Sequence, residues 1–215
     1  DMELDLVLRS RKPPAVHGEA GVSVKGDEPG AASHYYSMTR LEAEGTIRAG
    51  ETAESCAGLA WMDHEFSTSV LASDQEGWDW MGLQLDDGTE LMLYRIRRDD
   101  GSIDPASSGS FVRPDGEVEH LTSADFEMTP GRRWRSPQSG ATYPVAWRVA
   151  VPRLGIRIDV GAAMDDQELV TTESTGITYW EGAVRVRGTS AGRAVEGRGY
   201  LEMTGYAAPF RMRGD

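Results

Sequence analysis

Several features that would mark a familiar class of site are scarce or missing in this sequence. It has one cysteine, Cys56, so no internal disulfide can form. Its four histidines are scattered, which argues against a His-rich metal site, and we expect no metal. It contains no G-x-S-x-G elbow, Walker loop, dinucleotide fingerprint or zinc spacing. We therefore expect no cofactor.

Long apolar runs and an excess of positive charge are missing as well. No run of about 18 apolar residues could form a membrane-spanning helix, although hydrophobic residues make up 39% of the chain, enough for a sizeable core. The opening residues DMELDLVLRS lack the basic start and apolar stretch of a secretory signal and read like the middle of a strand, which suggests a mature form or a fragment. The net charge of −13 would repel phosphate backbones, so nucleic acid is not an expected partner.

What the sequence does contain is alternation with a period of two residues. The stretches at 2–9, 90–97, 155–161 and 182–188 alternate in this way, which is typical of half-buried strands. Turn signals fall between such stretches at 49–50, 87–88, 114–116 and 190–192. The pattern predicts about nine to eleven strands in an antiparallel barrel or sandwich built from hairpins.

One predicted hairpin gathers ionisable and aromatic side chains. If 49–50 is a two-residue loop, Tyr36 lies opposite Asp63, Met38 opposite Trp61 and His34 opposite Glu65. Opposed residues share one side of a sheet, so this register places five of these side chains on one surface: His34, Tyr36, Trp61, Asp63 and Glu65.

Such a surface could perform acid catalysis if it lines a barrel interior. Burial raises the pKa of a carboxyl, so Asp63 could hold a proton near neutral pH and donate it to an alkene. Aromatic faces beside it would stabilise the resulting carbocation. Alternatively, these polar residues hydrogen-bond one another at a barrel mouth and the rings simply pack. His64 is expected on the opposite face, so "DHE" is not a metal triad.

A second aromatic group comes from the stretch GWDWMGLQLDDG. Trp78 and Trp80 are expected to share a face, and a turn at 87–88 would place Trp80 opposite Arg95 and Met81 opposite Tyr94. Trp78, Trp80, Tyr94 and Glu65 are candidate substrate contacts, with core packing as the alternative for the tryptophans. The strand carboxyls Glu181 and Glu202 are expected to pair with Arg185 or Arg187.

Five stretches together resemble one known family: SHYYSMTRLEAEGTI, GLAWMDHEFSTSVL, GWDWMGLQLDDGTELMLYRIR, YPVAWRVAVP and YWEGAVRVRG with GRGYLEMTGY. In order and spacing they look like the AttH-like, carotenoid 1,2-hydratase (CrtC-like) family. The resemblance implies an all-β, up-and-down lipocalin-like barrel at 33–215. It also implies that 1–32 are a strand and linker resembling the exit from a first barrel that is missing here.

The resemblance also implies an activity. In the carotenoid enzymes a His-x-Trp and a Tyr-x-Asp element are implicated, and the matching positions here are His34-x-Tyr36 and Trp61-x-Asp63, with the two aromatics swapped. The expected catalytic residues are therefore Asp63 as proton donor, His34 to orient water, and Trp61 and Tyr36 around the cation. The leading hypothesis is a hydratase, a cofactor-independent hydro-lyase that adds water to a C=C bond of an isoprenoid or other apolar substrate.

Two other functions remain open at this stage: a non-catalytic carrier of an apolar ligand, and a pericyclase or cyclase that uses the same pocket. The expected partner is a small apolar substrate. Peripheral membrane contact and contact with the missing first barrel are further candidates. By resemblance, an exported, periplasmic or membrane-associated location is favoured over the cytoplasm.

Overall fold

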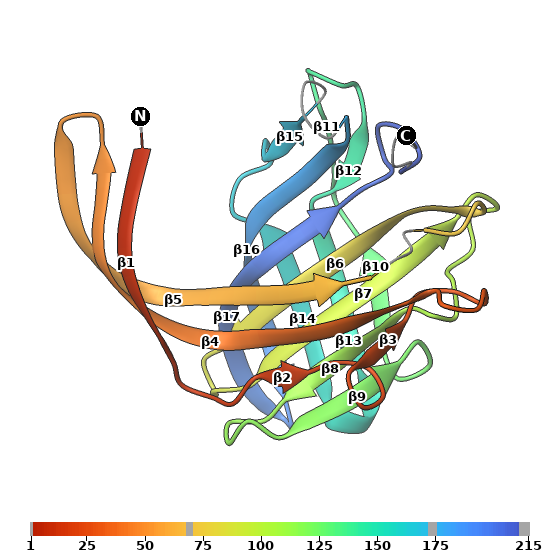
Figure 1. The fold of residues 1–215 in the computed structure, drawn as a ribbon, viewed down its shortest axis with the longest axis horizontal. Coiled ribbons are helices and arrows are strands. Elements are labelled where there is room, and N and C mark those ends of the chain that lie inside the picture. Colours follow the sequence, from red (N-terminus) through yellow and green to blue (C-terminus); the bar gives the residue numbers. More distant parts are fainter. Residues whose placement is uncertain (1, 68–70, 172–175, 211–215) are drawn as a thin grey trace.

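The computed structural model describes residues 2–67, 71–171 and 176–210, and this part of the chain is almost entirely antiparallel β-structure (Figure 1). Its one helical element is a 3₁₀ turn, η1 (Pro152–Leu154), and no helix in the described ranges is long and apolar enough to cross a membrane. The strands form a large sheet, a small sheet and a two-stranded ribbon of β11 (Arg133–Arg135) and β12 (Thr142–Pro144).

The large sheet forms an up-and-down barrel. In chain order its strands are β6 (Gln75–Leu85), β7 (Glu90–Arg98), β8 (Ser108–Val112), β9 (Val118–Thr122), β10 (Glu127–Pro130), β13 (Ala146–Val151), β14 (Ile156–Ala162), β15 (Glu168–Val170), β16 (Thr178–Ser190) and β17 (Arg193–Met203). Apart from β15, which pairs only with β16, each strand pairs with its neighbours in this order, and β17 pairs back onto β6. Only the step from β9 to β10 is unpaired within the described residues. The predicted up-and-down, lipocalin-like fold is confirmed.

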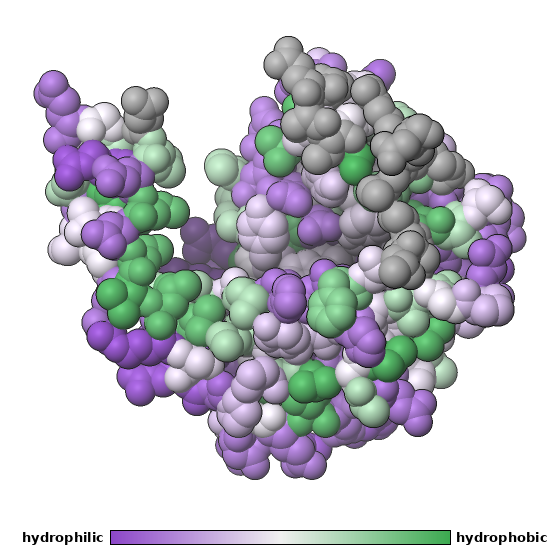
Figure 2. Space-filling view, in the orientation of Figure 1, coloured by the Kyte–Doolittle hydropathy of each residue, from purple (hydrophilic) through white to green (hydrophobic). Residues whose placement is uncertain are grey.

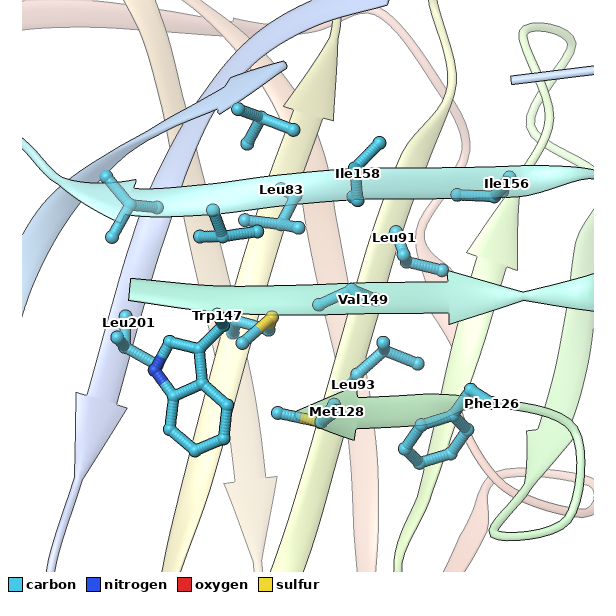
Figure 3. Packing of buried hydrophobic residues seen from close by; sticks show 14 of the residues in the cluster. Leu83, Leu91, Leu93, Phe126, Met128, Trp147, Val149, Ile156, Ile158 and Leu201 are labelled. Carbon is cyan, nitrogen blue, oxygen red and sulfur yellow. The ribbon is translucent and has the colours of Figure 1, made fainter. Parts of the chain in front are cut away.

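Alternation along the strands fills the barrel with apolar side chains (Figure 3). Leu83 on β6, Val149 on β13 and Ile158 on β14 all point into this core and are at most 3% exposed. Each such side chain stabilises the fold by about 1.5–3 kcal/mol relative to leaving it in water. The barrel interior is therefore a packed core in the described part of the chain.

The small sheet lies against the outside of this barrel. It contains β1 (Met2–Ser10), β2 (Ala15–Val16), β3 (Val22–Val24), β4 (Ala32–Ala49) and β5 (Thr52–Phe66). The long hairpin β4–β5 crosses β6 and β7 (Figure 1), where a second, smaller apolar cluster forms around Tyr35 and Tyr94. Buried Glu90 of β7 fixes the junction, because Lys12 Nζ reaches its Oε2 at 2.6 Å and Arg40 contacts its Oε1.

The other end of the small sheet extends away from the barrel as an arm of β1 with the paired ends of β4 and β5 (Figure 1). One face of the arm is apolar (Figure 2), and Met2 and Leu4 on it are 76% and 60% exposed. Their partners on β4 are Ala49 and Ile47.

The register of the β4–β5 hairpin differs from the predicted one. Ala49 pairs with Thr52, so Gly50 and Glu51 form the loop. This loop alone would move each partner by two residues from the predicted one, and a bulge between Met38 and Leu41 then moves it back by one, so the net shift is one residue. As a result Ser37, not Tyr36, lies opposite Asp63, and the predicted shared face of His34, Tyr36 and Asp63 is wrong.

The register of the β6–β7 hairpin is also one residue away from the prediction. Leu85 N donates to Thr89 O at 2.9 Å, so the turn has three residues and Gly88 takes the left-handed conformation it requires. Trp80 therefore pairs with Tyr94, and the predicted pairing of Trp80 with Arg95 is wrong. Arg95 instead lies opposite Asp79 and stacks on Trp147, with its Cζ 4.4 Å from the ring centroid.

Candidate active site

A cavity of about 350 Å³ lies between the β4–β5 hairpin and the outer face of the barrel. Trp78 and Trp80 of β6 and Tyr94 and Ile96 of β7 form its barrel side. Trp78 and Trp80 share this face as predicted, while Asp79 points the other way and is fully buried. The remaining lining residues are Lys25, Ser33, Tyr35, Asp63, Glu65, Ser67, Leu71 and Glu202.

Asp63 of β5 is held by three donors on a single oxygen. Its Oδ1 accepts hydrogen bonds from Tyr35 Oη at 3.0 Å, from Trp61 Nε1 at 2.9 Å and from Ser37 Oγ. Within the described residues Oδ2 accepts none, which leaves that oxygen for a ligand. The carboxyl can therefore exchange a proton at Oδ2 without losing the bonds that position it.

Asp63 is an exposed residue whose carboxyl is nevertheless partly buried. β5 is an edge strand, so the residue as a whole keeps exposed surface, whereas its carboxyl is partly buried between the two sheets. Burial raises the pKa of Asp63 above its ordinary value; its three hydrogen bonds oppose this rise and the charge of Glu65 adds to it.

A chain of hydroxyls and an imidazole continues behind Asp63. His17, which is 1% exposed, has Nε2 at 2.7 Å from Ser37 Oγ and Nδ1 at 2.8 Å from Ser110 Oγ. Since Ser37 gives its proton to Asp63, His17 must carry its proton on Nε2 and accept one from Ser110. Burial, assisted by the charge of Lys25, lowers the pKa of His17 to about 3, so the ring is neutral.

Aromatic side chains form the rest of the wall. Trp61 meets Trp80 edge to face, with ring centroids 6.2 Å apart, and Trp80 Nε1 donates to Tyr35 Oη at 3.1 Å. Tyr94 Oη lies 2.9 Å from Ser23 Oγ and accepts from Ser108 Oγ at 2.8 Å. Because these polar tips are satisfied, the rings present mainly apolar surface to the cavity.

Three carboxyls and one ammonium face the cavity. Lys25 Nζ pairs with Glu65 at 2.9 Å and lies 3.9 Å from the centroid of the Tyr94 ring. Asp63 and Glu202 have no cationic partner within the described residues. The resulting negative potential favours a neutral or positively charged ligand. No group of three or more potential metal ligands occurs in the part of the chain that is described.

The structure brings together six of the eight residues predicted from the sequence. Asp63, Glu65, Trp78, Trp80 and Tyr94 line the cavity, and Trp61 is bonded to Asp63. His34 and Tyr36 lie on the opposite face of the hairpin, where His34 contacts the Phe66 ring and Tyr36 the His64 ring. These two side chains line a separate shallow hollow with Val16 and Met38.

Five residues of the site were not predicted as such from the sequence: Tyr35, Ser37, His17, Lys25 and Glu202. For Tyr35 and Ser37 the period-two signal was present, but the bulge decides which residues of β4 face the cavity. His17 and Lys25 flank short strands whose pairing with β4 has no local signal. Glu202 was expected to pair with Arg185 or Arg187; instead Trp78 Nε1 donates to its Oε1 at 2.6 Å.

Comparison with known proteins identifies the family of this chain. The family model described as AttH-like matches residues 1–206. The chain belongs to the AttH-like family. It is similar to a crystal structure of an AttH protein from Nitrosomonas europaea, with a TM-score of 0.87 and 37% identity over 96% of this chain and 62% of that one.

Two further relatives carry names that describe activities. Kievitone hydratase from Nectria haematococca superposes with a TM-score of 0.76 at 18% identity, over 96% of this chain and 62% of that one. Dehydratase asqC of Emericella nidulans is 22% identical over 209 residues, which cover 94% of this chain and 58% of the relative. This chain thus spans about three fifths of the length of each of these three proteins.

Proposed function

We propose that this AttH-like protein is a cofactor-independent hydro-lyase that adds water to, or removes it from, a small neutral apolar substrate in the cavity between hairpin and barrel. The observation that carries the proposal is Asp63, a carboxyl with one oxygen fixed by three donors and the other open to a ligand. A group positioned in this way can transfer a proton to or from a reacting carbon or hydroxyl.

The aromatic wall supports the same chemistry. Breaking a C–O bond or protonating an alkene builds positive charge on carbon, and the aromatic rings of Trp80 and Tyr35, which line the cavity with Asp63, can stabilise a cation. An isoprenoid double bond, which would give a tertiary cation, fits such a wall, as does another alkene or alcohol of similar size. The names hydratase and dehydratase of two relatives describe the two directions of this reaction.

A carrier and a cyclase are the competing functions. A carrier for an apolar ligand gains nothing from two unpaired carboxyls facing its pocket, because desolvating them weakens binding. A cyclase that acts through pocket shape does not need Asp63. The presence of Asp63 and Glu202 in the cavity therefore favours proton transfer over either alternative.

The test is conversion by the purified protein. Kievitone, chosen because of the named neighbour, and a panel of small neutral alkenes and tertiary alcohols are incubated with it, and products are followed by mass spectrometry. We expect gain or loss of one water, and we expect Asp63→Asn to lower kcat by about 10²–10⁴-fold, the usual contribution of a proton-transfer group. Asp159→Asn, at an exposed position of β14 outside the cavity, serves as the matched control and should behave as wild type.

The other outcomes of this screen would indicate a different function. Binding without conversion would identify a carrier, and an isomer of unchanged mass would identify a cyclase. Wild-type turnover by Asp63→Asn would remove Asp63 from the reaction.

A further inference from the structure

Glu202 is a second carboxyl in the cavity, on the wall that faces the hairpin. It belongs to β17 and lies in one row across the barrel surface, beside Trp80 of β6 and then Tyr94 of β7. Asp63 belongs to β5, on the hairpin that covers this surface. A ligand between the two sheets would therefore have one carboxyl on each side.

No cation neutralises Glu202 within the described residues. The arginines expected to pair with it are directed elsewhere, because Arg185 lies opposite Arg198 and Arg187 opposite Glu196. The one hydrogen bond that its carboxyl makes in this part of the chain comes from Trp78 Nε1, at 2.6 Å from Oε1. A partly buried carboxyl without an ion pair serves the fold poorly, since its charged form is costly there.

The groups facing Glu202 are predominantly acidic. Glu181 lies directly opposite it on β16, and Asp63 and Glu65 face it from β5. The ammonium of Lys25, which also lines the cavity, is already paired with Glu65. Burial raises the pKa of Glu202 to about 7; the Trp78 hydrogen bond opposes this, and the charges of Glu181, Asp63 and Glu65 add to it. Two further titratable neighbours, Tyr179 and Tyr200, are neutral at this pH, since burial and the charges of Glu202 and Glu181 raise their pKa above the ordinary tyrosine value.

The two carboxyls therefore differ in the protonation state that their surroundings favour. Burial raises the pKa of both carboxyls, but three donors converge on Asp63 and oppose that rise, whereas Glu202 receives one donor within the described residues and faces three other carboxyls. Pairs of acids whose environments separate them in this way divide the roles of acid and base.

We propose that Glu202 is the general acid of the reaction and Asp63 the general base, acting from opposite sides of the substrate. This proposal rests on the hydro-lyase function above and reverses the role that sequence analysis gave Asp63. In hydration, the alkene π-electrons take the proton of Glu202, water bonds to the resulting cationic carbon, and Asp63 removes a proton from that water. In dehydration, the bonds break and form in reverse.

The step needs no further reactant. Each turnover leaves Glu202 ionised and Asp63 protonated, or the converse in dehydration, and one proton returned through solvent restores the resting pair. Because the carboxyls are on opposite sheets, proton and hydroxyl should add to opposite faces of the double bond.

A first experiment tests the acid itself and needs no substrate. Protein labelled with ¹³C at the glutamate carboxyls is titrated by NMR, and the Glu202 signal is assigned by its loss in Glu202→Gln. We expect it to titrate near pH 7 and to move to lower pH in Asp63→Asn, which removes a neighbouring negative charge. Titration in the ordinary glutamate range, near 4.3, would overturn the assignment of Glu202 as acid.

A second experiment uses the alkene or alcohol that wild type converts in the screen above. Glu202→Gln should lose at least 100-fold in kcat with KM changed less than threefold. Its residual activity should lack the limb near pH 7 that we expect in wild type, on the alkaline side for hydration of an alkene and on the acid side for dehydration of an alcohol. Glu196→Gln, on the same strand and face but outside the cavity, is the matched control.

The outcomes separate the two proposals. Loss of turnover in Asp63→Asn with full turnover in Glu202→Gln would overturn the role of Glu202 and leave the hydro-lyase intact. Failure of wild type to convert any probe would overturn both. Turnover in D₂O adds a stereochemical readout, since deuterium and hydroxyl on the same face of the product would contradict catalysis from opposite walls.

Discussion

Hydrogen bonds from hydroxyl and indole donors stabilise the ionised forms of Asp63 and Glu202 to different extents. Tyr35 Oη donates to Asp63 Oδ1 and accepts from Trp80 Nε1, so one phenol joins the base to the aromatic wall. Tyr36, next to it in the chain, contacts His64 on the far side of the hairpin. Adjacent tyrosines on one strand thus have different surroundings, and only Tyr35 stabilises the ionised form of Asp63.

Replacement of these two tyrosines tests which face of β4 serves the site. Tyr35→Phe removes a donor to Asp63, so the pKa of Asp63 should rise, kcat should fall about tenfold, and stability should fall by about 1–3 kcal/mol because Trp80 Nε1 loses its acceptor. Tyr36→Phe should match wild type. The measurement is kcat against pH for both variants. An equal loss in Tyr36→Phe would restore the assignment made from the sequence.

At the level of strands and hairpins, alternation in the sequence predicts which segments form strands and which residues of one strand share a face. Period two identifies the long strands, and with turn signals it predicts the up-and-down barrel. It also places Trp78 and Trp80 together, because within one strand the face of a residue depends only on parity. Asp63, Glu65 and Trp61 follow for the same reason.

What alternation cannot supply is the register between strands. The loop at Gly50 and Glu51 and the bulge after Met38 each move the partner of every later residue, and an odd total shift reverses the face. His34 and Tyr36 were misplaced for this reason. Glu202 was missed because its cavity forms only when a distant hairpin covers β17 and β6, and no local pattern reports that contact.

Gly82 on β6 shows how close that contact is. A Cβ placed there would lie 2.7 Å from Trp80 Cη2 and 3.3 Å from Trp61 Cε2. The two indoles therefore pack over bare backbone. A strand glycine has this role where another group approaches closely.

Substitution of Gly82 should disturb the site through this contact. Gly82→Ala should displace the Trp80 ring, weaken its bond to Tyr35 and destabilise the protein by about 1–3 kcal/mol, the usual cost of overpacking. Gly161→Ala on β14, where a Cβ meets nothing within 4 Å, is the control and should be nearly neutral. Urea unfolding and tryptophan fluorescence measure both effects. Unchanged fluorescence and stability in Gly82→Ala would show that the indoles do not rest on this backbone.

At the scale of the whole molecule, two titratable groups of the site, His17 and Glu202, make the folding stability depend on pH in opposite directions. His17 is neutral when folded, with a pKa of about 3 against 6.5, so the folded state loses stability as pH falls through that interval. Glu202 has a pKa raised from 4.5 to about 7, so its protonated form favours the folded state below 4.5 and that contribution is lost as pH rises through 7. The two groups together favour a stability maximum at mildly acidic pH.

One substitution tests the loss of folding stability that ionisation of Glu202 causes at alkaline pH. Glu202→Gln removes the group whose ionisation disfavours folding, so this variant should gain about 1–3 kcal/mol relative to wild type at pH 8.5 and much less at pH 4.5. Glu196→Gln removes an exposed carboxyl from the same face of β17 and should show no such dependence. Urea unfolding at both pH values gives the two differences. A pH-independent difference for Glu202→Gln would mean that Glu202 ionises in the folded protein as it does in the unfolded chain, and the acid assigned to the active site would then lack the proton it must donate.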